Sequence, residues 1–126
     1  MNRKILIIDD SPTLRKLLRH YLQKKGYSTR EANHGRVGLD IIAREAFDLI
    51  ILDMEMPVMG GAQVLEILNE KKDFSVPILI LSSDKQEESM VTGISLGAKY
   101  YMTKPFKPNE VVDRIEEIFS MRDQQK

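Results

Sequence analysis

Polar residues that could bind or transfer charged groups come directly after apolar runs of this sequence. Asp9 and Asp10 end the segment ILIIDD, Asp53 ends LIILD, and Ser82 ends ILILS. Lys104 ends the segment YYMTK in the same way. Carboxylate oxygens are the ligands that hard cations such as Mg²⁺ prefer. A carboxylate can also accept a phosphoryl group as a nucleophile. These residue types therefore suit phosphoryl transfer, provided that the fold brings them together.

The three aspartates would repel one another if they lay side by side. Two carboxylates about 4 to 5 Å apart repel by roughly 3 to 4 kcal/mol at an effective dielectric constant near 20. Lys104 supplies one positive charge, and oxygen ligands without cysteine or histidine favour Mg²⁺ as the second cation. In this interpretation Asp53 is the nucleophile, and Ser82 donates a hydrogen bond to a phosphoryl oxygen.

Three apolar runs predict strands that are covered on both faces. They lack the alternation of polar and apolar residues that marks a half-exposed strand. The runs are Ile5–Ile8, Leu49–Leu52 and Ile78–Leu81. Two further strands are expected at Tyr27–Ala32, which is more polar and suits a sheet edge, and at Tyr100–Thr103.

Helical patterns separate these strands. Ser11 and Pro12 are typical of a helix start, and Gly26 is typical of its end. The other helices are expected around Val37–Ile42, after Gly60-Gly61, over Lys85–Leu96 and from Pro108 to Phe119.

Alternating strands and helices predict an α/β fold with one five-stranded parallel sheet and helices on both faces. Because all strands of such a sheet point the same way, the residues that follow them meet along one rim, where ligands of open α/β sheets bind. The candidate residues all follow strands. With no linker or repeat in the sequence, we expect one domain over residues 1–126.

Composition argues against several classes of protein. The 19 basic and 19 acidic residues give zero net charge, so the chain has no overall positive charge to attract nucleic acid. The absence of cysteine excludes disulfides and thiolate zinc sites. The apolar stretch near the N-terminus is too short for a signal peptide or a membrane span. We therefore expect a cytoplasmic protein that contacts neither nucleic acid nor membrane directly.

The segments IDDSPT, LDMEMPVMGG, PILILSS and TKPF together resemble the receiver domains of two-component response regulators. The resemblance covers essentially the whole chain and is nearest to the single-domain, CheY-like branch. It implies a doubly wound, flavodoxin-like sheet with strand order 2-1-3-4-5. It also implies a signalling switch, rather than an enzyme with a separate substrate, in which Asp53 is phosphorylated from the phosphohistidine of a sensor histidine kinase or phosphotransfer protein.

The resemblance assigns a Mg²⁺ site to the same rim. It implies that Asp10, Asp53 and the backbone carbonyl of Glu55 ligate the ion and that Asp9 assists through water.

In the phosphorylated state, the resemblance implies that Lys104 pairs with the phosphoryl group and that Ser82 is the switch hydroxyl. It makes Tyr101 the aromatic residue that turns inward on activation. It also implies a cis bond between Lys104 and Pro105. The output would be a surface formed by the fourth helix, the fifth strand and the fifth helix, where a downstream protein binds.

Other functions fit the same architecture. A flavodoxin would bind a flavin phosphate after the first strand, where Asp9 and Asp10 would repel it. A phosphoaspartate hydrolase of the haloacid-dehalogenase type would need aspartate at the position of Glu55. A third alternative is a binding module that no longer accepts phosphate. The presence of all the candidate residues argues against it, namely Asp9, Asp10, Asp53, Ser82 and Lys104. The receiver part of a larger transcriptional response regulator remains an alternative.

Overall fold

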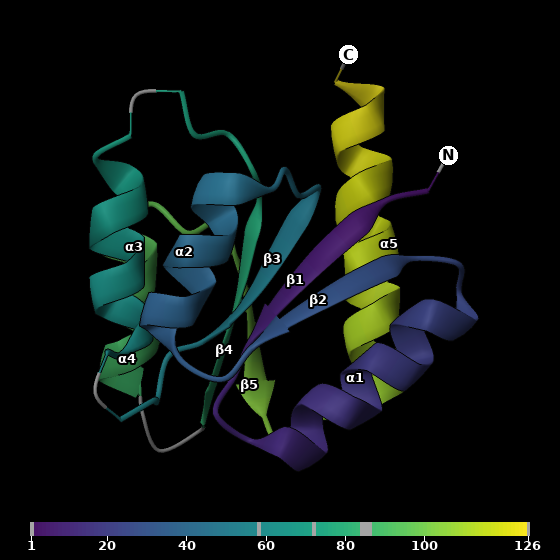
Figure 1. Ribbon diagram of the computed structural model, residues 1–126, viewed down its shortest axis with the longest axis horizontal. Coiled ribbons are helices and arrows are strands. Elements are labelled where there is room, and N and C mark those ends of the chain that lie inside the picture. Colours follow the sequence, from purple (N-terminus) through teal and green to yellow (C-terminus); the bar gives the residue numbers. More distant parts are fainter. Residues whose placement is uncertain (1, 58, 72, 84–86, 126) are drawn as a thin grey trace.

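The computed structural model describes residues 2–57, 59–71, 73–83 and 87–125. Within these ranges strands and helices alternate along the chain (Figure 1). The strands are β1 (Lys4–Ile8), β2 (Ser28–Ala32), β3 (Leu49–Asp53), β4 (Ile78–Ser83) and β5 (Tyr100–Lys104). The helices are α1 (Pro12–Lys24), α2 (Gly35–Arg44), α3 (Gly61–Asn69), α4 (Glu87–Ser95) and α5 (Pro108–Gln124).

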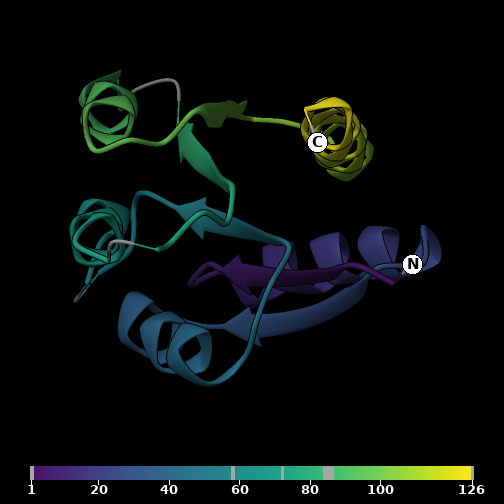
Figure 2. The same ribbon diagram turned by 90° about the horizontal axis from the view of Figure 1, so that it is seen from above.

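The five strands form one parallel sheet in the order β2-β1-β3-β4-β5, which confirms the predicted fold class and strand order. Helices α1 and α5 cover one face, and α2, α3 and α4 cover the other (Figure 2). Each face has its own apolar core, because alternate residues of a strand point to opposite sides. Ile5–Ile8 and Leu49–Leu52 are buried on both sides, as their unbroken apolar sequence predicts.

Local signals explain where the first helix begins and ends. The Ser11 hydroxyl accepts a hydrogen bond from the backbone N–H of Leu14 at 3.2 Å and so caps α1, while Pro12 occupies its first turn. After the helix, Gly26 adopts a positive φ of 95°, which glycine accepts without strain.

Element boundaries differ from the expectations by a few residues. Tyr27 precedes β2, which begins at Ser28. The described part of the fourth helix is Glu87–Ser95, and the expected start at Lys85 lies outside the described residues. Strand β5 extends to Lys104, because this residue pairs with Ser83 of β4. Lys104 is therefore held by the sheet itself.

The backbone at the start of α3 approaches the backbone at the end of β3 closely. A Cβ atom on Gly61, the first residue of α3, would lie 2.6 Å from the sulfur of Met54 and 2.8 Å from the backbone oxygen of Asp53. Glycine at this position lets α3 begin directly against the chain that leaves β3. The backbone position of Asp53 therefore depends on Gly61.

Both termini lie at the opposite end of the molecule from the carboxyl ends of the strands (Figure 1). Among the described residues, no helix combines the length and the apolar character that a membrane span requires.

Candidate functional site

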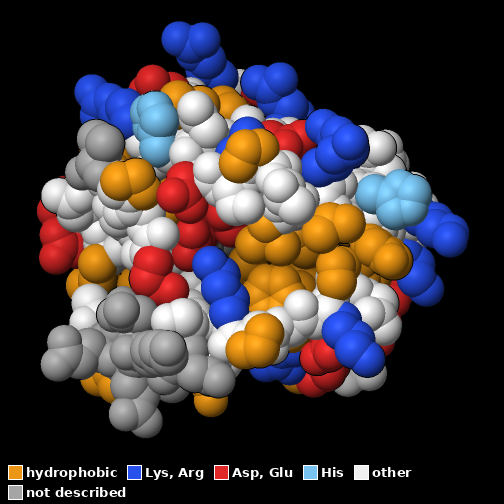
Figure 3. All heavy atoms as spheres, turned by 90° about the horizontal axis from the view of Figure 1, so that it is seen from below, with side chains coloured by type: hydrophobic (Ala, Val, Ile, Leu, Met, Phe, Trp, Pro, Cys, Tyr) orange, Lys and Arg blue, Asp and Glu red, His pale blue; other side chains and the backbone are white. Residues whose placement is uncertain are grey.

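The carboxyl ends of β1, β3, β4 and β5 bring the predicted residues together at one rim. Figure 3 views the molecule from this side and shows acidic side chains beside basic ones, with a hydrophobic patch next to them. In the described part of the chain, the buried polar or charged residues are Asp9, Asp53 and Ser82. All three belong to the predicted set. Burial of such groups is unfavourable unless they are paired, so their coincidence at one rim points to a site.

The aspartates form a compact group of oxygen ligands. One carboxylate oxygen from each of Asp9, Asp10 and Asp53 lies within 4.8 Å of the others. Asp9 Oδ1 accepts a hydrogen bond from the backbone N–H of Ser11 at 2.9 Å. Asp9 Oδ2 is buried and has no hydrogen-bond partner among the described residues. A buried carboxylate oxygen of this kind is suited to a cation or to a water molecule that a cation holds.

The pKa values of Asp53 and Asp9 also point to a cation-binding site. Burial, reinforced by the neighbouring charge of Asp9, raises the pKa of Asp53 from its ordinary value of 3.8 to about 7, although Lys104 acts in the opposite direction. Burial also raises the pKa of Asp9. The folded chain therefore holds these carboxylates in a place that disfavours their ionised forms. A hard divalent cation fits this all-oxygen group because it would stabilise the ionised forms.

Lys104 and the backbone of Glu55 hold the Asp53 side chain. Lys104 Nζ donates a hydrogen bond to Asp53 Oδ1 at 3.1 Å, and the Glu55 N–H donates to the same oxygen at 3.1 Å. The Lys104-Pro105 peptide bond is cis, as predicted. Asp53 is thus oriented by two donors that both bind Oδ1.

The carboxylate of Glu55 makes contacts that the sequence analysis did not predict. Its Oε2 accepts a hydrogen bond from the Ser82 hydroxyl at 2.8 Å, and its Oε1 accepts one from the Ser83 N–H at 2.9 Å. The metal-ligand role that the sequence predicted for Glu55 concerned its backbone carbonyl. A signal was nevertheless present, because an acidic residue two positions beyond β3 is within side-chain reach of the end of the adjacent strand β4.

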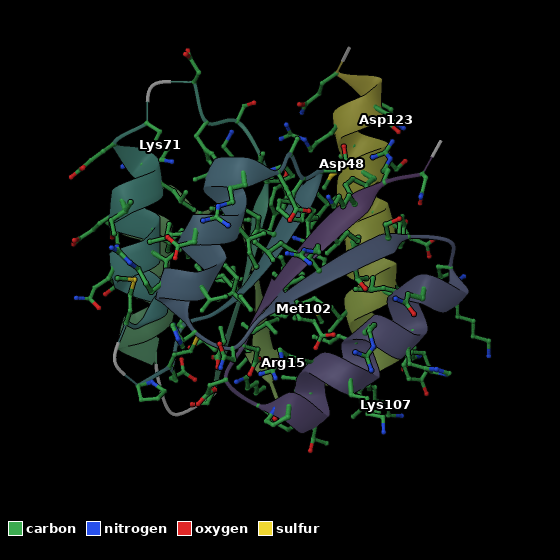
Figure 4. All side chains as sticks on the ribbon, in the orientation of Figure 1. Arg15, Asp48, Lys71, Met102, Lys107 and Asp123 are labelled. Atoms are coloured by element: carbon green, nitrogen blue, oxygen red, sulfur yellow. The ribbon has the colours of Figure 1, made fainter. Side chains whose placement is uncertain are left out.

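Arg15 is a second residue that the sequence analysis missed. Its Nη1 donates to the backbone oxygen of Asp9 at 2.7 Å, and its Nε lies 3.2 Å from Glu31 Oε1. Arg19 Nη1 binds the other Glu31 oxygen at 2.7 Å. Figure 4 shows Arg15 on α1 at the end of the molecule where the strands terminate. Arg15 therefore ties the loop after β1 to α1 and β2.

Tyr101 lies on the strand next to that of Ser82, two residues away in register, and its side chain is exposed. It pairs with Ile80, and Ser82 pairs with Thr103, so Tyr101 and Ser82 are on neighbouring strands, as predicted. The Tyr101 side chain is 45% exposed. Two apolar residues of α4, Val91 and Ile94, are 58% and 50% exposed. Helix α4 and strand β5 thus present large apolar side chains at the surface.

Comparison with known proteins finds relatives whose sequences align with most of this chain. The sequence matches the response regulator receiver domain family over residues 5–116. It is 40% identical over 118 residues to the alkaline phosphatase synthesis transcriptional regulatory protein PhoP of Bacillus subtilis. It is 36% identical over 116 residues to the regulatory protein VanRc of Enterococcus gallinarum. The alignments cover 94% and 92% of this chain but 49% of each relative, so the chain spans about half their length.

Solved structures of similar extent also match. The chemotaxis response regulator CheY4 of Vibrio cholerae superimposes with a TM-score of 0.86 and is 31% identical, over 94% of this chain and 99% of that one. A CheY-like response regulator receiver domain protein of Methanospirillum hungatei gives a TM-score of 0.91 at 25% identity and covers 100% of both chains.

Proposed function

The chain belongs to the response regulator receiver domain family, and on this premise we propose that Asp53 accepts a phosphoryl group from a phosphohistidine. The family consists of signalling switches, and this chain is a phosphorylation-activated receiver of two-component signal transduction. The observation that carries the proposal is the position of Asp53. Its carboxylate is 1% exposed, ends a buried strand, and is bound by a lysine ammonium group 3.1 Å away.

The proposed step exchanges one bond for another. A carboxylate oxygen of Asp53 forms a bond to phosphorus while the P–N bond of the phosphohistidine breaks, and that electron pair goes to the imidazole nitrogen. Lys104 balances the charge of the phosphoryl oxygens after transfer, and the Ser82 hydroxyl donates a hydrogen bond to one of them. Positioning and charge balance of this kind supply most of the catalysis in phosphoryl transfer.

The acidic group supports a Mg²⁺ site in the same place. We assign Asp10, Asp53 and the backbone carbonyl of Glu55 as ligands, with Asp9 acting through water. A bound Mg²⁺ ion would neutralise charge on the carboxylates and on the phosphoryl oxygens. The support from this structure is the compact all-oxygen group and the buried Asp9 Oδ2.

The proposed partners are a sensor histidine kinase or phosphotransfer protein and a downstream protein. The downstream protein would bind α4, β5 and α5, and Tyr101 would turn inward when Asp53 is phosphorylated. The exposed apolar side chains of Val91, Ile94 and Tyr101 support this surface. A cytoplasmic location is part of the proposal, because the relatives include transcriptional regulatory proteins.

A second candidate is that this receiver is one part of a larger transcriptional response regulator. The observation that favours it is the 49% coverage of PhoP and VanRc. The match to CheY4 covers 99% of that chain, so this receiver also resembles a response regulator of similar length. The full reading frame around this chain decides between them.

The experiment that tests phosphorylation uses acetyl phosphate and Mg²⁺. We expect intact-protein mass spectrometry to show one added phosphoryl group, which hydroxylamine removes. Asp53→Asn keeps the shape of the side chain without the nucleophile, so this variant should remain unmodified. Equal modification of the variant would refute the assignment of Asp53.

A further inference from the structure

Glu55 occupies two hydrogen-bond donors at the end of β4. Its carboxylate binds the Ser82 hydroxyl at 2.8 Å and the Ser83 N–H at 2.9 Å, one through each oxygen. We call these two bonds the Glu55 clamp. A hydrogen bond to an ionised acceptor is stronger than one between neutral groups, so the clamp is a substantial contact.

The clamp lies directly beside the proposed phosphorylation site. Asp53 pairs with Leu81 across β3 and β4, so the next residue of β4 is Ser82. The backbone N–H of Glu55 donates to Asp53 Oδ1 at 3.1 Å. Glu55 therefore contacts Asp53 with its backbone and β4 with its side chain, and it spans the space between the two strand ends.

A phosphoryl group on Asp53 and the Glu55 carboxylate have the same chemical requirement. Both are anions that present oxygen acceptors, and both would face the donors at the end of β4. The Ser82 hydroxyl has one hydrogen to donate and the Ser83 amide has one. Each donor can therefore serve one of the two anions well, but not both.

We infer that Glu55 acts as an internal competitor of the phosphoryl group for the Ser82 hydroxyl and the Ser83 N–H. This inference rests on the proposed function of Asp53 and adds a residue that opposes the phosphorylated state. Phosphorylation then requires release of the clamp, and the freed Glu55 carboxylate must find another position. The Ser82 hydroxyl and the Ser83 N–H exchange their hydrogen bonds to Glu55 for hydrogen bonds to the phosphoryl group. This exchange couples phosphorylation of Asp53 to the end of β4.

The test measures the affinity of the protein for beryllofluoride, an analogue of the phosphoryl group, in saturating Mg²⁺. Glu55→Met removes the carboxylate at similar side-chain length and keeps the backbone carbonyl. Glu66→Met is the matched control, because it removes the same charge from an exposed position of α3. We expect Glu55→Met to bind beryllofluoride about tenfold more tightly than the parent protein, and Glu66→Met to bind like the parent.

A Ser82→Ala background separates competition from simple charge repulsion. Without the hydroxyl, only the Ser83 N–H remains to be released, so the gain from Glu55→Met should fall to about threefold or less. An equal gain in both backgrounds would mean that Glu55 acts through its charge alone, and would overturn the inference. Absence of any gain in the parent background would overturn it as well.

Nuclear magnetic resonance of the beryllofluoride-free protein tests the clamp itself. The Ser83 amide proton should move upfield in Glu55→Met but not in Glu66→Met, and an unmoved Ser83 resonance would contradict the clamp. If the parent protein binds no beryllofluoride and Asp53→Asn behaves identically, the proposed function fails and the competitor role fails with it. If the parent binds and Glu55→Met gains nothing, only the competitor role fails.

Discussion

Replacing Asp53 by asparagine should change how the stability of the metal-free protein depends on pH. The pKa of Asp53 is raised from 3.8 to about 7, chiefly by burial and then by the charge of Asp9. The folded state therefore holds a proton on Asp53 that the unfolded chain has already released. The stabilising contribution of this proton is complete below about pH 3.8 and is lost as the pH rises through about 7.

The magnitude follows from the pKa difference. One pKa unit corresponds to about 1.4 kcal/mol, so the full contribution is about 4 kcal/mol, of which about 3 kcal/mol is lost between pH 5 and pH 8. Asparagine cannot titrate. The free energy of unfolding of the parent protein should therefore fall relative to that of Asp53→Asn by about 3 kcal/mol over this range.

The assay is urea unfolding of both proteins in a chelator, followed by circular dichroism at several pH values. Contributions from all other carboxylates appear in both proteins and largely cancel in the difference. Saturating Mg²⁺ should stabilise the parent protein at pH 8, because the ion binds the folded state and favours the ionised carboxylates. Parallel pH curves for the two metal-free proteins would refute the claim that the folded protein disfavours the ionised form of Asp53.

Three further predictions concern the rim. Asp10→Ala should weaken Mg²⁺ binding in calorimetry and stabilise the metal-free fold by about 1 kcal/mol, since it removes carboxylate repulsion; a destabilised metal-free variant would identify Asp10 as a structural residue instead. Gly61→Ala should destabilise the protein by about 1 to 3 kcal/mol in urea unfolding, whereas Gly60→Ala, whose added Cβ has no atom closer than 3.5 Å, should be nearly neutral. Equal effects of the two changes would contradict the close approach at the start of α3. Beryllofluoride should shift the nuclear magnetic resonance signals of α4 and Tyr101, and changes confined to residues around Asp53 would remove the proposed output surface.

The fold could be predicted because its signals are local and repeated. Unbroken apolar runs such as Leu49–Leu52 indicate a strand buried on both faces, and Ser11-Pro12 and Gly26 mark the ends of a helix. The alternation of these elements leaves few topologies open. The position of Asp53 next to Ser82 and Lys104 then follows from the parallel direction of the strands.

Side-chain contacts within the rim could not be predicted in the same way. Glu55 was expected to contribute its backbone, yet its carboxylate binds Ser82 and Ser83. Arg15 reads in the sequence as a basic residue of an amphipathic helix, yet it binds the backbone oxygen of Asp9. Both contacts depend on the distance between strand ends and on the turn of one helix over the sheet. Residue spacing along the chain does not contain that information.

The same packing explains which part of the molecule can respond to phosphorylation. Asp53 ends β3 and Asp9 directly follows β1, and both strands are buried on both faces. Ser82 lies at the end of β4, which leads to α4, and α4 exposes Val91 and Ile94. Asp9 and Asp53 are thus buried, whereas these two side chains of α4 are exposed. A phosphoryl group at Asp53 can shift a two-state equilibrium only through contacts that differ between the states. The donors at the end of β4 meet this condition, because in one state they bind Glu55 and in the other they would bind the phosphoryl group.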